Sequence, residues 1–197
     1  MILNIIKLGI KLLLKNHCKD IIIRKIHVLT KNNIFRGNIE KLIIEADHII
    51  YKEFYLNHLK IVGFNLDINL NNNSKFLKIK DFYAQANIHI NSENLKNIIN
   101  KNRTVVNNKV RKFVAQNNYI KKISFDNQSI LFYILKGHKI FKCIYILNYN
   151  NNNLILKDIN SKKYLLIPFD QNIIFKSLSF NKNYLELKFN CKVQLEN

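Results

Sequence analysis

Histidine, cysteine and serine are the residues that most often bind metals or act as nucleophiles, and they are scattered along this sequence. The six histidines form no H-E-x-x-H motif and no pair at four-residue spacing, which would place two ligands on one helix face. No serine occupies a G-x-S-x-G turn. Cys18, Cys143 and Cys191 are far apart and form no C-x-x-C pair, which indicates reduced thiols packed as small apolar groups. We therefore expect no metal site and no cofactor.

The acidic residues include one pair that catalysis could use. Glu45 and Asp47 are two positions apart on an expected strand, so they share one of its faces. Paired carboxylates can act as general acid and base, but two acids on a strand are far more often solvated surface residues. The chain also has only four glycines, too few for the glycine-rich phosphate loops of nucleotide enzymes. We expect a protein without catalytic residues, not an enzyme.

The chain is strongly basic. Its 32 lysines and arginines exceed its 13 acidic residues and give a formal charge of +19. Only four are arginines, whose planar fork nucleic-acid readers usually exploit, whereas abundant Lys, Asn and Ile is typical of an A+T-rich genome. Base composition therefore accounts for much of the charge. A nucleic acid is the alternative partner, and the basic residues that favour it are Lys101, Arg103, Lys109, Arg111 and Lys112.

Residues 1–19 predict an amphipathic helix at the N-terminus. Its polar positions recur at three- and four-residue spacing, and isoleucines and leucines cover the remaining surface. Lysines interrupt the apolar run too often for a transmembrane span or a secretory signal. The helix either packs on the protein's own sheet or lies in a membrane interface. In the second case, the membrane-surface residues are Ile2, Ile5, Ile6, Lys7, Lys11, Leu13 and Lys15.

Residues 20–197 predict a single α+β domain. Apolar and polar residues alternate along about eight segments, which is typical of strands with one wet face. A helix is expected to start at residues 91–93, where Asn-Ser-Glu supplies a cap and an acid in the first turn. A second helical patch follows over residues 106–114, where Val and Phe recur at three- and four-residue spacing. No linker divides this region.

The phase of the alternation changes within two of the expected strands. One change falls at Gly63, where we expect a β-bulge or bend, and the other falls between Ile79 and Phe82. Each bulge adds bend and twist to a strand. The predicted fold class is therefore α+β, with a strongly curved, mostly antiparallel sheet packed on two or three helices.

Residues 130–135 read ILFYIL and are apolar or aromatic at every position. An antiparallel strand of this kind has two buried sides, or one side that meets a non-aqueous phase. A closed core between sheet and helices satisfies the first condition, and a concave groove for acyl chains satisfies the second. For the groove, the expected lipid-binding residues are Phe64, Phe82, Phe132 and Tyr133.

Several apolar motifs occur in a distinctive order. Residues 34–39 read IFRGNI, Ser92-Glu93-x-Leu95 follows a strand, and residues 173–193 form a closing hairpin. From about residue 20 to residue 195, this order resembles the LmeA-like family of cyanobacteria, plastids and actinobacteria. The other matching positions are Leu42, Ile44, Ala46, Tyr51, Leu56, Leu59, Ile61, Leu66, Ile68, Ala84, Ala86, Ile88 and Ile90.

The resemblance implies a non-enzymatic phospholipid-binding protein whose curved α+β fold is related to tubular lipid-binding modules. It implies no catalytic residue. The chain is more basic and richer in Asn than typical relatives and has no clear export signal, which indicates a plastid-encoded protein in the stroma or peripheral to a plastid membrane. The expected partners are a phospholipid or another acyl lipid and a membrane surface. The alternatives are a basic RNA- or ribosome-associated protein and an assembly factor that binds another protein.

Overall fold

The structure is a computed structural model that describes residues 2–30, 38–51, 54–69, 78–79, 82–101 and 104–193. The phase change expected between Ile79 and Phe82 falls on residues 80–81, which lie outside the described residues. The described elements follow in this order: α1 (Ile2–His17), β1 (Cys18–Leu29), β2 (Asn38–Tyr51), β3 (Phe54–Asn69), β4 (Lys78–Ile79), β5 (Phe82–Asn91), α2 (Ser92–Lys101), α3 (Val105–Ala115), β6 (Tyr119–Asp126), β7 (Ser129–Lys136), β8 (Lys139–Asn150), β9 (Asn153–Asp158), β10 (Tyr164–Pro168), β11 (Ile173–Phe180) and β12 (Tyr184–Val193).

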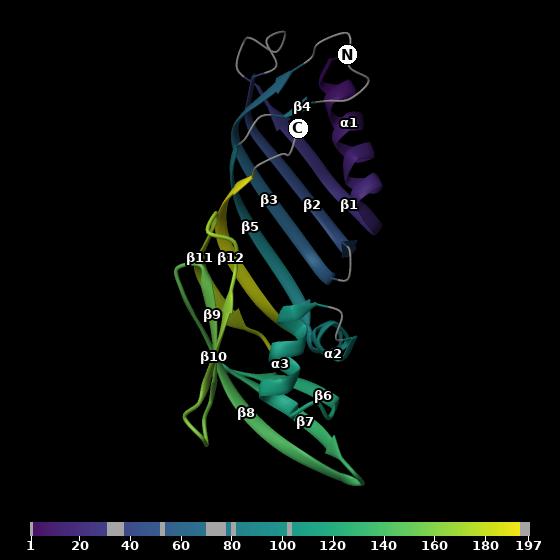
Figure 1. Ribbon diagram of the computed structural model, residues 1–197. Helices are drawn as coiled ribbons and strands as arrows, with labels where there is room; N and C mark the ends of the chain where they lie inside the picture. Colours follow the sequence, from purple (N-terminus) through teal and green to yellow (C-terminus); the bar gives the residue numbers. More distant parts are fainter. Residues whose placement is uncertain are drawn as a thin grey trace.

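The strands form two antiparallel sheets, so the expected α+β class with a mostly antiparallel sheet is confirmed. The first sheet has the order β1-β2-β3-β5-β12-β11, with β4 paired to β3, and the second has the order β10-β9-β8-β7-β6. Figure 1 shows an elongated molecule with the first sheet at the N-terminal end and the second at the other end. Strands β11 and β12 join them, because Phe175, Leu185 and Leu187 pack into the core of the second sheet.

Helix α1 covers part of one face of the first sheet. Ile6 and Ile10 are 1% and 4% exposed, and they pack with Leu42, Ile44 and Leu66 of β2 and β3. The i and i+4 spacing of the two isoleucines places them on one helix face, as the sequence pattern predicts. Of the two interpretations of this helix, packing on the protein's own sheet is therefore correct for this face.

Helices α2 and α3 cover the inner face of the second sheet. Asn91 caps α2, since its Oδ1 accepts a hydrogen bond from the Asn94 N–H at 2.7 Å. Thr104 has an extended backbone and caps α3 by accepting from the Asn107 N–H at 3.1 Å. Both helices begin where the sequence predicts a helix. They enclose a core of aromatic and branched side chains that centres on Phe132.

The expected bulge at Gly63 is wrong. Gly63 pairs with Leu42 on β2 and Ala84 on β5, and the register continues unbroken on both sides. The alternation of buried and exposed residues in β3 changes instead at Asn65, which has a φ of +52°. Phe64 and Asn65 are both exposed, and Leu66 is buried again. A Cβ at Gly63 would lie 3.0 Å from Cε2 of Phe82, so the glycine is needed for close packing.

Candidate apolar binding site

An apolar cavity of about 310 Å³ lies between α1 and the first sheet, and its accessible surface carries no polar atom. The C-terminal half of α1 forms its roof, and side chains of β2, β3, β5 and β12 form its walls and floor. The roof consists of Gly9, Ile10, Leu13 and Leu14, and the floor consists of Phe82, Ala84, Ala86, Phe189 and Cys191.

Small side chains create the cavity. Gly9 adds no side chain to the roof, and Ala84 and Ala86 each add a single methyl group to the floor. Ala84 and Ala86 point to the same side of β5 because strand residues two apart share a face. Among the described residues, no bulky side chain fills the space that these three leave. The Ala-x-Ala spacing in β5 was visible in the sequence, but only the structure shows that it lies under a helix glycine.

The chemistry of the cavity suits hydrocarbon. A buried polar group without a hydrogen-bond partner costs several kcal/mol, and this surface offers no partner to a polar ligand. Cys191 brings the only sulfur of the described lining, and burial raises the pKa of its thiol, so the group stays neutral. The described lining therefore has no charge and no activated nucleophile, and its surface suits the binding of an apolar group.

The structure separates the four aromatic residues that the sequence grouped as lipid-binding. Phe82 lines the cavity. Phe64 projects from the opposite face of the first sheet, where Lys41 Nζ lies 5.8 Å from its ring centroid. Phe132 is 1% exposed in the second core, so its assignment to an open groove is wrong. Tyr133 lies on the outer face of the second sheet, and the four therefore do not form one site.

The residues expected on a membrane surface are divided between two sides of α1. Ile6 is buried against the sheet and Leu13 lines the cavity, so neither faces outward, and the assignment of both to a membrane face is wrong. Ile5 is exposed, and with Leu8 and Leu12 it forms an outward apolar stripe. Lys11 and Lys15 are exposed, Lys7 is half-buried, and the Ile2 side chain lies outside the described residues. Within the described part of the chain, every helix is too short or too polar to cross a membrane.

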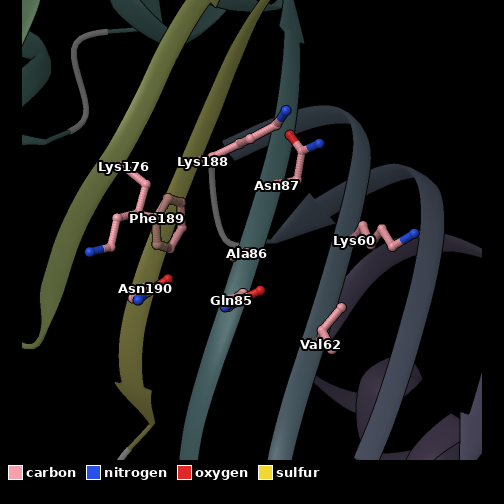
Figure 2. A pocket seen from close by; sticks show the side chains of 9 residues that line it. All are labelled: Lys60, Val62, Gln85, Ala86, Asn87, Lys176, Lys188, Phe189 and Asn190. Carbon is pink, nitrogen blue, oxygen red and sulfur yellow. The ribbon is translucent and has the colours of Figure 1, made fainter.

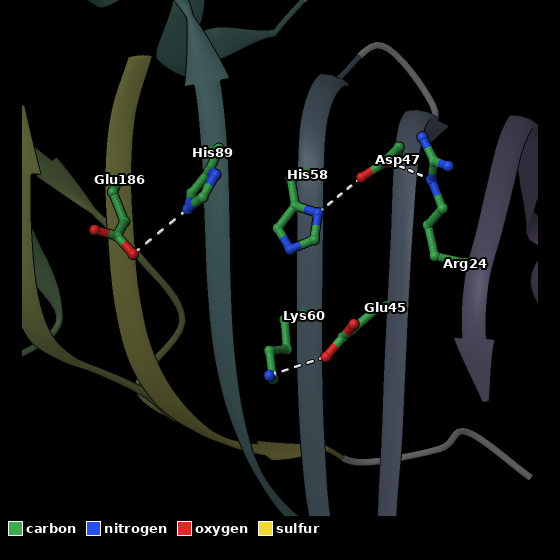
Figure 3. Close-up of polar contacts among 7 residues, drawn as sticks. All are labelled: Arg24, Glu45, Asp47, His58, Lys60, His89 and Glu186. Carbon is green, nitrogen blue, oxygen red and sulfur yellow. Dashed lines mark hydrogen bonds and ion pairs between the residues drawn. The ribbon is translucent and has the colours of Figure 1, made fainter. Parts of the chain in front are cut away.

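The opposite face of the first sheet is polar and carries a row of titratable groups (Figure 3). Asp47, His58, His89 and Glu186 occupy directly opposite positions on β2, β3, β5 and β12. His58 Nδ1 lies 2.7 Å from Asp47 Oδ1, and His89 Nε2 lies 3.4 Å from Glu186 Oε1. The two imidazole rings are 5.1 Å apart, and Arg24 donates to the other oxygen of Asp47. The row is a chain of cross-strand pairs that crosses four strands.

Glu45 and Asp47 share this face but do not act as a pair of acids. Glu45 accepts from Lys60 Nζ at 2.9 Å, and Asp47 binds Arg24 and His58. The hydrogen bond from Lys60 holds the pKa of Glu45 below its usual value, and the one from His58 does the same for Asp47. Both are therefore ionised near neutral pH, in agreement with the surface-pair interpretation.

Glu186 is the most strongly perturbed carboxylate of the face. Burial raises its pKa, but hydrogen bonds from Asn87, Ser179, Lys188 and His89 outweigh this effect and lower the pKa to about 2. The carboxylate is therefore ionised over the whole physiological range, and it holds β5, β11 and β12 together on this side.

A hollow of about 410 Å³ lies on the same polar face, and three lysines are among its lining residues (Figure 2). Two of them are paired with carboxylates, Lys60 with Glu45 at 2.9 Å and Lys188 with Glu186 at 3.2 Å, so of the described lysines here Lys176 alone adds an unpaired charge. The amide side chains of the hollow belong to Gln85, Asn87 and Asn190. Its net charge is small, and it is a weaker candidate than the apolar cavity.

Of the basic residues that favour a nucleic acid, Lys109 and Lys112 are exposed on α3, whereas Lys101 and Arg111 make contacts within the protein. Arg111 donates to the backbone carbonyls of Asn117 and Asn118 at 2.9 and 3.4 Å, where it caps the end of α3. Lys101 contacts the hydroxyl and the ring of Tyr55, and Arg103 lies outside the described residues. Across the part of the chain that the structure describes, no group of three metal-binding side chains converges either.

Comparisons with known protein families, curated proteins and solved structures found no match to this chain. The LmeA-like resemblance therefore stays an expectation that rests on sequence motifs, and the case for a function depends on the geometry of the cavity.

Proposed function

We propose that this chain is a non-enzymatic binding protein for an acyl lipid, whose hydrocarbon chain occupies the cavity between α1 and the first sheet. The observation that carries the proposal is the wholly apolar surface of this 310 Å³ cavity. Protein sites for small molecules range from about 300 to 1,000 Å³, so the cavity falls at the lower end of that range. This size suits a single acyl chain better than a whole lipid.

The free energy available is sufficient for a retained ligand. The cavity has room for about ten water-sized groups at ~30 Å³ each, and a methylene group is of similar size. Burying each methylene contributes about 0.8 kcal/mol, which gives on the order of 8 kcal/mol for the chain inside. The loss of freedom on binding offsets several kcal/mol of this, and the remainder supports retention during purification.

We propose that the ligand is a phospholipid and that the protein lies at a plastid membrane surface. The LmeA-like resemblance supports both, and it also supports a relation of the sheet and helix to tubular lipid-binding modules. The outward stripe of α1 adds a contact of suitable chemistry, because exposed Ile5, Leu8 and Leu12 lie beside exposed Lys11 and Lys15. Apolar and basic residues on one helix favour an anionic membrane interface.

The test is lipid analysis of the purified protein. Native mass spectrometry and solvent extraction should recover an acyl lipid from the wild type and much less from Ala86→Leu, which fills the cavity floor. Gln85→Leu is the matched control, since the neighbouring residue is exposed on the polar face, and it should retain the lipid. Absence of acyl lipid from the purified wild type would exclude the proposal. RNA affinity that falls steeply with salt would favour the alternative partner.

A further inference from the structure

The hairpin of β7 and β8 projects at the end of the molecule opposite the N-terminus (Figure 1). Lys136 and Lys139 pair at its end, so Gly137 and His138 form a two-residue turn, and Gly137 has the positive φ (+60°) that such turns require. The turn therefore ends the hairpin in a narrow tip.

Large apolar side chains lie exposed beside this turn. Ile140 is 49% and Phe141 is 48% exposed, and they project to opposite sides of β8 because they are consecutive strand residues. Phe141 is on the inner side, opposite the buried Ile134, but it remains exposed. Each side of the tip therefore carries an exposed apolar side chain.

The outer face of the same hairpin is apolar as well. Phe132 and Tyr145 point inward, where the Tyr145 hydroxyl donates to the Val114 carbonyl of α3 at 3.3 Å. The intervening residues point outward, and Leu131 and Ile144 pair directly there. Leu131 is 8% exposed and Ile144 is half-buried, and neither belongs to the two core clusters of the described residues. One face of β7 thus packs in the second core, and its other face belongs to neither of the two described cores.

The charge of the hairpin has a single sign. Between Asp126 and Asp158 the sequence contains no acidic residue. Lys136 and Lys139 are directly opposite each other at the tip, and like charges in this position repel. On the outer face, Lys142 and Lys122 flank Tyr133, with Lys122 Nζ 5.6 Å from the ring centroid. An anionic surface would neutralise this repulsion.

We propose that the β7–β8 hairpin docks on an anionic lipid surface, with Ile140 and Phe141 at the hydrocarbon boundary and Lys136, Lys139 and Lys142 at the headgroups. Apolar side chains flanked by lysines are the combination that such an interface binds. Two copies of this basic tip would repel each other, which disfavours a dimer. Nucleic acids favour stacking on aromatic rings and gain little from exposed aliphatic side chains. The inference rests on the proposed function only in taking lipid as the partner class.

The test is co-sedimentation with phosphatidylcholine vesicles that contain or lack phosphatidylglycerol. We expect wild-type binding only with phosphatidylglycerol, and a loss of at least about tenfold for Ile140→Asp/Phe141→Asp. The control is Tyr83→Asp/Val105→Asp, which makes the same charge change at apolar residues that are 70% and 72% exposed, and it should bind within about twofold of the wild type. If the Ile140→Asp/Phe141→Asp variant does not fold, Lys136→Gln/Lys139→Gln/Lys142→Gln replaces it. We expect this lysine variant to lose vesicle binding by about tenfold or more.

Three outcomes would overturn the inference. The first is equal binding by hairpin variant and wild type, which would assign vesicle binding to the outward stripe of α1. The others are no wild-type binding to anionic vesicles, and a wild-type dimer that the hairpin variant abolishes. Lipid recovered by native mass spectrometry from the same hairpin variant separates this inference from the proposed function. The hairpin variant should keep its cavity lipid while it loses vesicle binding. A wild type without cavity lipid that still binds vesicles through the hairpin would contradict the proposed function alone.

Discussion

The two cores of the molecule are both built from an antiparallel sheet and helices, but only one of them is closed. The second sheet packs on α2, α3, β11 and β12, and at its centre the rings of Phe132 and Tyr145 are nearly perpendicular, with their centroids 5.4 Å apart. The buried cluster of the first sheet includes residues of α1 and of no other described helix, and this sheet contains the cavity. A helix is about 10–12 Å wide, whereas six strands spaced about 4.8 Å apart span roughly 24 Å. One helix therefore cannot cover this sheet.

The difference shows that side-chain size decides whether the space between a sheet and its helices is filled. In the second core, aromatic rings fill the space between sheet and helices. In the first, Gly9, Ala84 and Ala86 occupy the positions where larger side chains would close the gap. The open region of the first core is therefore a property of a few small residues, and substitutions can close it.

The largest expected effect is the loss of the ring at the centre of the closed core. Phe132→Ala should lower the free energy of unfolding by about 3–5 kcal/mol, because it removes buried apolar surface and leaves a cavity. Urea unfolding followed by circular dichroism measures the change. Phe64→Ala, at a ring that is 36% exposed on the polar face, should cost well under half as much. Equal losses would contradict the difference in packing.

A pair of identical substitutions sharpens the comparison within the first sheet. Ala46 is 0% exposed and does not line the cavity, so Ala46→Leu should overpack the structure and cost about 1–3 kcal/mol. Ala86→Leu should leave stability unchanged or raise it, because the new side chain enters the cavity. Thermal unfolding of both variants, each stripped of lipid, is the measurement. A larger loss of stability from Ala86→Leu than from Ala46→Leu would mean that the cavity has no room for the new side chain.

The polar face makes a prediction about acid. The pKa of Glu186 is about 2 in the folded state against an ordinary 4.5, so its contribution is complete above about pH 4.5 and is lost as the pH falls toward 2. Glu186→Gln should lower stability at neutral pH by on the order of 1–2 kcal/mol, since the group is partly solvated. It should also flatten the decline of stability between pH 4.5 and 2. Unfolding at a series of pH values tests this, with Glu93→Gln, a mostly exposed acid, as the control.

The smallest effect concerns a helix of the closed core. Thr104→Ala removes the side chain that accepts from the Asn107 N–H and should cost about 1 kcal/mol. Thr104→Ser keeps the acceptor and should restore most of that loss. Denaturant unfolding of the two variants distinguishes them, and equal stability of the Ala and Ser variants would argue against a capping role.

Much of the local structure was predictable, because the signals lie within a few residues of each other. The cap at Asn91 precedes α2, and the alternation of apolar residues predicts the strands of both sheets. The prediction at Gly63 failed for a physical reason. A glycine within a strand is compatible with a bulge or with a close neighbour, and only the position of Phe82 distinguishes them.

The candidate site was less predictable than the fold. Sequence reasoning favoured large aromatic residues, of which only Phe82 lies at the cavity, and it overlooked the glycine and alanines that make room. The signal was present as Ala84-x-Ala86, but small residues on a strand are equally typical of tight packing against a helix. The unusual run of apolar residues in β7 did indicate a strand with two distinct apolar faces.

Taken alone, the order of residues determined which segments form helices and strands, which face of each is apolar, and how strongly basic the chain is, because these properties depend on neighbours along the chain. The tertiary structure decided that the strands divide into two sheets, that α1 packs Ile6 and Ile10 on the first sheet, and that a cavity remains beside it. Those features depend on contacts between residues far apart in the sequence, and the shape of a gap depends on every side chain around it.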